Sequence, residues 1–220
     1  MPHSFGALGS YFLVLAESTD HSAVWKGEIG LTHYFNPGDP LALRHFTKTL
    51  SSLLEKEDLT GRDIVILCIG SDRATGDSLG PMVGHQLARI QKNFHLYGTL
   101  KNPVHAKNLE DALTFIELNH KNPFIIAIDA SLGVAEHIGY ITLGEGSLAP
   151  GVGVAKKLPA VGDLCITGIV NLSGFGGQML LQTTRLSLVI ELASFIASGL
   201  RRCLCVPGVS QFRSSLQRAK

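Results

Sequence analysis

Two kinds of hydrophobic pattern divide the chain. In some segments, apolar residues recur every three or four positions, which predicts amphipathic helices. These segments are residues 43–57, 79–90, 109–118 and 178–200. Other segments are short apolar runs of strand length, namely 63–69, 124–129, 138–143 and 164–170. The runs at 63–69 and 124–129 show little alternation of polar and apolar residues, which indicates strands buried on both faces of a parallel sheet.

The last predicted helix is apolar on several sides. One stripe consists of Met179, Thr183, Leu186, Ile190, Ala193, Ala197 and Leu200. Leu181, Leu188 and Leu192 make other faces apolar, so we expect them to be covered by the domain or by a second copy of the chain in a homo-oligomer. A membrane span is the rival interpretation, but Arg185 and Glu191 interrupt the run and would be costly in lipid. We therefore expect no membrane partner.

The order of these elements predicts a single doubly wound α/β domain, which 220 residues can form. We place the domain at residues 39–205. Residues 1–38 lack a sustained period and end in the turn cluster NPGDP, which indicates a loosely attached N-terminal extension. Residues 206–220 are assigned to a C-terminal tail.

Composition narrows the classes of function. Hydrophobic residues make up 45% of the chain and charged residues 17%, which is typical of a compact globular protein. The formal net charge of +1 indicates no electrostatic attraction to nucleic acid. The phosphate-binding patterns GxxxxGK[ST] and GxGxxG are missing, as are GxSxG and HExxH, so nucleotide-binding, serine-hydrolase and zincin functions have no motif in their favour.

The cysteines indicate a reducing compartment. Cys68, Cys165, Cys203 and Cys205 show no CxxC spacing, and two of them lie in apolar strand-like runs. The N-terminus lacks the basic start and long apolar core of a secretory signal. We therefore expect reduced thiols and a cytoplasmic protein.

Two aspartates are the strongest candidates for chemistry. Asp77 and Asp129 each follow an apolar strand and precede a glycine-bearing turn. If the two strands are parallel neighbours, both carboxylates reach the crevice at the carboxyl ends of the sheet, where such folds bind ligands. Two close carboxylates do not both ionise easily, so one holds a proton while the other acts as a base. The alternative is that each aspartate only caps the next turn or helix.

Further candidates surround these acids in the sequence. The glycine- and proline-rich loop at 144–163 is too long for a routine connection, and Lys156 in it could polarise a substrate carbonyl. Backbone N–H groups near Gly174 could bind an oxyanion, although tight packing explains these glycines equally well. The residues proposed to bind substrate are Ser71, Asp72, Thr75, His105, Gly151, Gly153, Gly174 and Gly176. His105 with the two aspartates also leaves a divalent metal open, although we expect no cofactor.

Four strings point to a known family. CIGSDRATGDSLGP, YGTLKNPVHAKNL, AIDASLG and PGVGVAKKLPAVGDLCITGIVN resemble the sporulation protein YyaC family and occur in the family's order, within a match covering about residues 41–200. That family is similar to the germination protease that degrades small acid-soluble spore proteins, and more distantly to hydrogenase-maturation peptidases. The resemblance implies a three-layer α/β/α domain with a mostly parallel sheet, of the phosphorylase/hydrolase-like kind.

The resemblance also implies roles for individual residues. Asp77 in GDSLGP matches one essential acid of the germination protease, and Asp129 in AIDA matches the other. The similar loop PGVGVAKK places Lys156 near the site. The implied function is aspartate-dependent peptide hydrolysis in sporulation or germination, with small acid-soluble spore proteins as candidate substrates. The chain is shorter than the protease, and Ser71 and Asp72 replace a different loop. A catalytically silent binding protein and a metal-dependent maturation-type peptidase remain alternatives.

Overall fold

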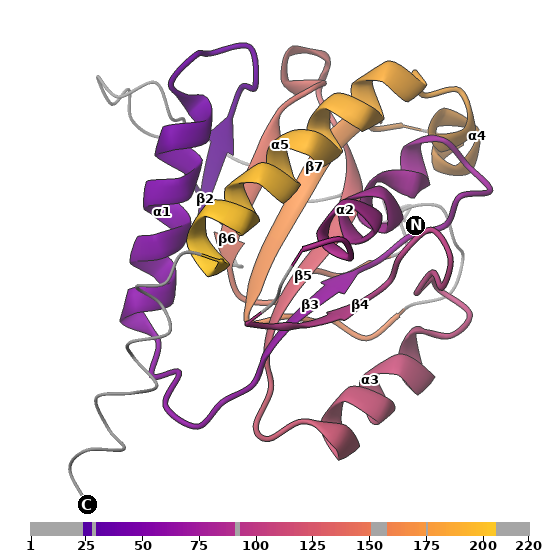
Figure 1. The fold of residues 1–220 in the computed structure, drawn as a ribbon. Helices are drawn as coiled ribbons and strands as arrows, with labels where there is room; N and C mark the ends of the chain where they lie inside the picture. The colour runs from indigo at the N-terminus through magenta and orange to yellow at the C-terminus, as the bar shows by residue number, and fades with distance from the viewer. Residues whose placement is uncertain (1–23, 28–29, 91–92, 151–157, 175, 206–220) are drawn as a thin grey trace, which may run out of the picture.

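The computed structural model describes residues 24–27, 30–90, 93–150, 158–174 and 176–205. Their strands form one seven-stranded sheet in the order β1-β2-β6-β7-β5-β3-β4 (Figure 1). The strands are β1 Val24–Gly27, β2 Gly30–Phe35, β3 Ile64–Cys68, β4 His95–Tyr97, β5 Phe124–Gly133, β6 Ile141–Glu145 and β7 Leu164–Leu172. The half of the sheet from β7 to β4 is parallel, and the pairs from β1 to β7 are antiparallel.

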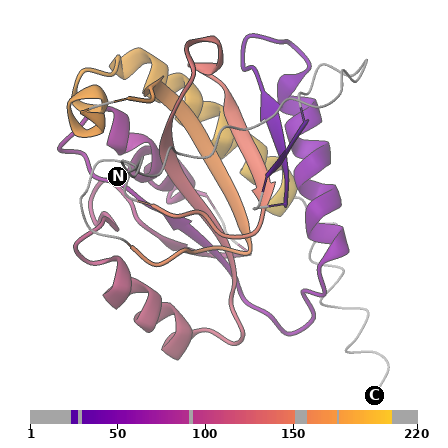
Figure 2. The same cartoon turned by 180° about the vertical axis from the view of Figure 1, so that it is seen from behind.

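Helices cover both faces of this sheet. They are α1 Ala42–Lys56, α2 Leu79–Leu87, α3 Leu109–Asn119, α4 Gly177–Gln182 and α5 Leu186–Leu204, with single 3₁₀ turns η1 Gly76–Ser78 and η2 Ala135–His137. Helices α1, α2 and α5 pack on one face, and α3 lies on the other, as Figure 1 and the reverse view in Figure 2 show. The predicted three-layer α/β/α fold is therefore confirmed.

The central parallel strands are buried on both faces, as their sequences predict. Ile66 and Ile128 belong to the core beneath α1, α2 and α5, whereas Val65 and Ala127 belong to the smaller core beneath α3. All four side chains are fully inaccessible to solvent. Burial of an aliphatic side chain of this size stabilises the fold by about 1.5–3 kcal/mol. The β3–β5 pair therefore anchors both cores at once.

The sheet begins inside the segment that the sequence analysis assigned to an N-terminal extension. Strand β2 pairs with β6, and Phe35 at its end is buried with its ring 5.3 Å from that of Phe46 in α1. The segment escaped prediction because β2 mixes polar residues such as Thr32 and His33 with apolar ones near the edge of the sheet. Short strands of this kind carry little hydrophobic periodicity.

The predicted continuous helix at 178–200 is wrong, because two helices occupy this segment. Helix α4 ends at Gln182 and α5 begins at Leu186. The Thr184 hydroxyl donates to the carbonyl of Leu180 at 2.9 Å, and the Asn171 amide donates to the same carbonyl at 2.8 Å. Two side-chain donors thus satisfy the Leu180 carbonyl, which a longer helix would have used, and they stabilise the break.

The break also changes which apolar residues are buried. Leu181 and Leu192 are buried, and Leu188 is half-buried against the core, as expected. The first half of the predicted stripe is exposed, however, at Met179, Leu186 and Ile190. Among the helices of the described part of the chain, none has the length and apolar character needed to cross a membrane.

Helix α2 approaches the sheet without side chains between the two backbones. Gly80 lies against the backbone of Ile69, and Gly84 lies against the carbonyl of Gly98 and 3.4 Å, measured from an ideal Cβ, from the Cys68 sulfur. A methyl group at Gly84 would overlap the Gly98 carbonyl oxygen. The spacing of these glycines on one helical face therefore sets the distance between α2 and β3.

This close approach predicts a position-dependent effect of one substitution. We expect Gly84→Ala to lower the free energy of unfolding by about 2 kcal/mol or more, because overpacking against backbone outweighs the higher helix propensity of alanine. Gly174→Ala is the matched control, since nothing lies within 4 Å of an added methyl group there. Urea unfolding of both variants measures the difference, and equal stabilities would contradict the assigned packing.

Candidate functional site

A cavity of about 290 Å³ lies at the carboxyl ends of β3 and β5. The two strands are parallel neighbours, as the sequence analysis required. The chain continues from β3 to β4 on one side and from β5 toward β6 and β7 on the other, which makes this the point where the strand order reverses. The polar side chains on the cavity wall are those of Ser71, Arg73, Asp77, His105, Lys107, Asp129, Gln178 and Gln182.

Asp77 reaches the cavity through a tight loop after β3. Gly70 has a φ of +135°, and its lack of a side chain lets the Asp77 carbonyl approach its backbone. That carbonyl accepts a hydrogen bond from the Ser71 backbone N–H at 3.1 Å. The loop thereby folds back on itself, and the turn η1 presents the half-buried Asp77 side chain to the cavity.

Asp129 enters the cavity from β5, which extends beyond the end of its neighbour β3. The last residues paired between β3 and β5 are Cys68 and Ile128, whereas Asp129 pairs only with Thr167 of β7. Asp129 is 7% exposed, and its Oδ1 accepts the backbone N–H of Ala130 at 2.8 Å. The residue lies inside β5 rather than at its end, because β5 continues beside β7 beyond the end of β3.

The two carboxyl groups influence each other. Burial raises the pKa of Asp129 well above its usual range, and the negative charge of Asp77 raises it further, against the hydrogen bond from Ala130. Burial also raises the pKa of Asp77, which the Ser71 backbone and the nearby His105 partly offset. Asp129 is thus the group that holds the shared proton and Asp77 the group that stays ionised, a division that a proton-sharing pair requires.

His105 contributes an unsatisfied polar atom to the same wall. It lies in the connection between β4 and α3, where its backbone N–H donates to Asn108 Oδ1 at 2.8 Å. Its Nδ1 atom is buried and has no hydrogen-bond partner among the residues that the structure describes. An unpaired buried polar group is costly, so this atom is suited to a water molecule or a substrate group in the cavity.

Other predicted site residues have mixed outcomes. Ser71 lines the cavity, but Asp72, Thr75, Gly174 and Gly176 do not, so the cavity gives no support to their assignment, which stays a prediction. Asp72 and Gly174 are exposed, and Thr75 instead accepts hydrogen bonds from Ser78 through its carbonyl oxygen. Gly176 has a φ of +82° and precedes α4, so its glycine identity serves the backbone turn. Gly151, Gly153 and Lys156 lie outside the described residues.

Sequence reasoning missed three polar residues of the wall and gave no role to a fourth, Lys107. Arg73 belongs to the loop that carries Ser71 and Asp77, and Gln178 and Gln182 come from α4. The two glutamines are four residues apart, a spacing that places both on one helical face. That spacing was the available signal, but in a single predicted helix over residues 178–200 the apolar stripe was the more prominent pattern.

The fold and the cavity define a three-layer α/β/α protein with two coupled carboxylates at the carboxyl ends of adjacent parallel strands. The chain belongs to the family described as "Protein of unknown function (DUF1256)", whose model matches residues 34–199. It is 51% identical over 168 residues to "Uncharacterized protein YyaC" of Bacillus subtilis (strain 168), which covers 76% of this chain and 81% of that protein. The resemblance to the YyaC family is therefore confirmed.

One solved structure is similar to this chain. It is the crystal structure of a [NiFe] hydrogenase maturation protease, HycI, from Thermococcus kodakarensis KOD1. The similarity covers 70% of this chain and 99% of that chain, with 17% identity and a TM-score of 0.42.

The burial of Asp129 predicts a pH-dependent cost in stability. Its folded pKa lies above the ordinary value of 3.8, so ionisation disfavours the folded state. The cost is absent below the unfolded pKa and grows as pH rises toward the folded pKa. We expect Asp129→Asn, which keeps the acceptor for Ala130, to raise the free energy of unfolding at about pH 7 by about 1 kcal/mol or more.

Urea unfolding at two pH values tests this expectation. The advantage of Asp129→Asn should vanish near about pH 3, where the wild-type carboxyl group is protonated in both states. Asp72→Asn is the matched control on an exposed acid and should change stability by less than about 0.5 kcal/mol. A wild type that is as stable as Asp129→Asn at both pH values would show that Asp129 ionises without cost.

Proposed function

We propose that this protein is a peptidase in which Asp77 and Asp129 share a proton and activate a water molecule on a peptide bond. One observation carries the proposal: both carboxyl groups line the same cavity, and the charge of Asp77 raises the pKa of Asp129. A structural role as turn caps explains neither the shared cavity nor the electrostatic coupling. Perturbed acids in a cleft are a common feature of catalytic sites.

The pKa directions assign the roles in the reaction. Ionised Asp77 removes a proton from water, and the oxygen attacks the carbonyl carbon of the substrate. Protonated Asp129 donates its proton to the leaving amide nitrogen as the C–N bond breaks. The products are a carboxylic acid and an amine. Asp77 is then protonated and Asp129 ionised, and transfer of one proton between them restores the starting state.

The surrounding polar groups suit a peptide backbone. Arg73, Lys107, Gln178 and Gln182 line the wall and can donate hydrogen bonds to substrate carbonyl groups. A donor close to the attacked carbonyl stabilises the oxyanion that develops in the transition state. The proposal keeps Lys156 as a candidate for this donor, on the resemblance of its loop to that of the germination protease.

The resemblance also guides the choice of substrate and setting. The strings around Asp77 and Asp129 resemble those of a protease that degrades small acid-soluble spore proteins. We therefore propose these proteins as the first substrates to test, and the cytoplasm of a sporulating cell or forespore as the place of action. We also propose that the chain forms a homo-oligomer, which a measurement of its mass in solution tests.

The proton-sharing pair predicts the behaviour of two isosteric variants. Asp77→Asn and Asp129→Asn should each lower the rate of spore-protein cleavage by at least about a hundredfold, because asparagine cannot serve as acid or base. Asp72→Asn should keep the wild-type rate, since Asp72 is exposed and lies outside the cavity wall. Cleavage is followed by mass spectrometry of the products. Full activity in both cavity variants would exclude the mechanism.

Cleavage assays with and without a chelator distinguish the metal-dependent alternative from the metal-free pair. Asp77, Asp129 and His105 line one cavity and are of residue types that bind divalent cations. If removal of metal stops hydrolysis and a divalent ion restores it, the reaction depends on that ion. The ion is then bound at this cavity if His105→Gln is not reactivated by the same treatment. Cleavage that persists in chelator favours the metal-free pair. Folded protein that cleaves no peptide under either condition supports the silent binding role instead.

A further inference from the structure

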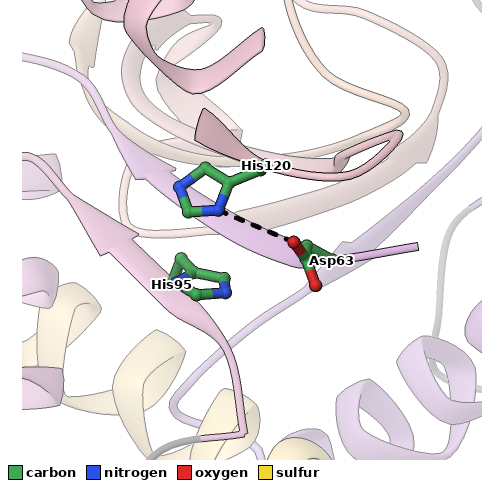
Figure 3. A group of neighbouring side chains, drawn as sticks. All are labelled: Asp63, His95 and His120. Atoms are coloured by element: carbon green, nitrogen blue, oxygen red, sulfur yellow. Dashed lines mark ion pairs between the residues drawn. The ribbon is translucent and has the colours of Figure 1, made fainter. Parts of the chain in front are cut away.

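A second cluster of titratable side chains lies at the opposite end of the parallel strands. It consists of Asp63, which precedes β3, His95, which begins β4, and His120, which follows α3 (Figure 3). Because β3 and β4 are parallel, their first residues share the amino-terminal edge of the sheet. The cavity with Asp77 and Asp129 lies at the carboxyl-terminal edge, so the two groups are separate.

The three side chains converge closely. Each offers one potential ligand atom, and these atoms lie within 4.8 Å of one another. His120 Nδ1 and Asp63 Oδ2 are 3.7 Å apart, which is too long for a good hydrogen bond. Two ligands about 2.0–2.2 Å from one zinc ion in tetrahedral geometry lie about 3.4 Å from each other. The observed separation is therefore close to that of two atoms on one ion.

The remaining ligand, His95, lies beside the other two. The His95 ring centroid is 4.1 Å from that of His120, and Figure 3 shows the two rings facing the same space beside Asp63. His95 is exposed, and its potential ligand atom already lies within 4.8 Å of those of the other two residues. His120, by contrast, is 8% exposed in its side chain and is held in place.

His120 is held by a partner of the kind that orients metal ligands. Its Nε2 atom lies 2.6 Å from the Tyr97 hydroxyl oxygen. When Nδ1 binds a metal, Nε2 carries the proton and donates it to such an oxygen, which fixes the tautomer and the ring. Asp63 is oriented too, because its Oδ2 accepts the Lys121 backbone N–H at 3.0 Å. Two of the three ligands are thus positioned before an ion arrives.

We propose that Asp63, His95 and His120 bind a divalent transition metal ion, with Zn²⁺ as the best match. Two imidazoles and one carboxylate suit this class of ion better than Mg²⁺ or Ca²⁺, which prefer oxygen ligands alone. Three protein ligands leave a fourth position for water or an incoming group. The proposal is independent of peptide hydrolysis at the other end of the sheet.

The ion would connect three elements that are distant in sequence. It joins the start of β3, the start of β4 and the end of α3, and β4 is an edge strand of only three residues. A ligand that binds only the folded state stabilises it. At an excess of about 100-fold over its Kd, zinc should therefore raise the Tm by about 5–10 °C.

Calorimetric titration of the metal-stripped full chain with zinc chloride tests the proposal. We expect one zinc ion per chain, and we expect cobalt to give the intense visible bands of a tetrahedral site. His95→Gln should weaken binding at least about tenfold and abolish the rise in Tm. This variant is the primary test because His95 is exposed, whereas His120→Gln also removes the contact with Tyr97.

Controls distinguish this site from other histidines and from the cavity. His45→Gln on α1 and Asp72→Asn, on an exposed acid, should bind zinc as the wild type does, while Tyr97→Phe should bind more weakly without losing a ligand. No zinc binding by the wild type would overturn the proposal. Equal binding by wild type and His95→Gln would also overturn it, because the zinc would then be bound elsewhere.

Discussion

The parallel pairing of β3 with β5 determines most of this structure. Because both strands are buried on both faces, residues such as Ile66 and Ile128 anchor one core while Val65 and Ala127 anchor the other. The same pairing brings the loop after β3 beside β5, so the two acids share one cavity. Loss of the pairing would therefore remove the packing of both layers and the site together.

Burial of the Asp129 carboxyl group in the cavity wall costs the folded state free energy. Asp129 is 7% exposed within an apolar strand and receives one backbone hydrogen bond from Ala130. Such an environment disfavours the ionised form, and the nearby Asp77 adds like-charge repulsion. An apolar residue at this position would pack without that cost. Retention of an acid where burial opposes its charge supports a chemical role over a structural one.

The sequence was sufficient to predict elements with a long or local hydrophobic pattern. It was insufficient for features that depend on contacts between residues distant in the chain. Continuous apolar runs predicted β3 and β5, and therefore the shared cavity of the two aspartates. The break before α5 depends on Asn171 donating to Leu180, which no helical periodicity records. Strand β2 owes its place to pairing with β6. The histidine cluster is invisible in sequence because its members come from three separate elements.

The break between α4 and α5 separates two helices of unequal length and burial. Helix α5 is fixed along its length by residues such as Val189 and Ile196. Helix α4 has six residues, of which Leu181 is buried, yet it supplies Gln178 and Gln182 to the cavity wall. A helix of that length has little stability of its own. The wall of the cavity that α4 forms therefore depends on its attachment at Leu181 and on its neighbours more than on the helix itself.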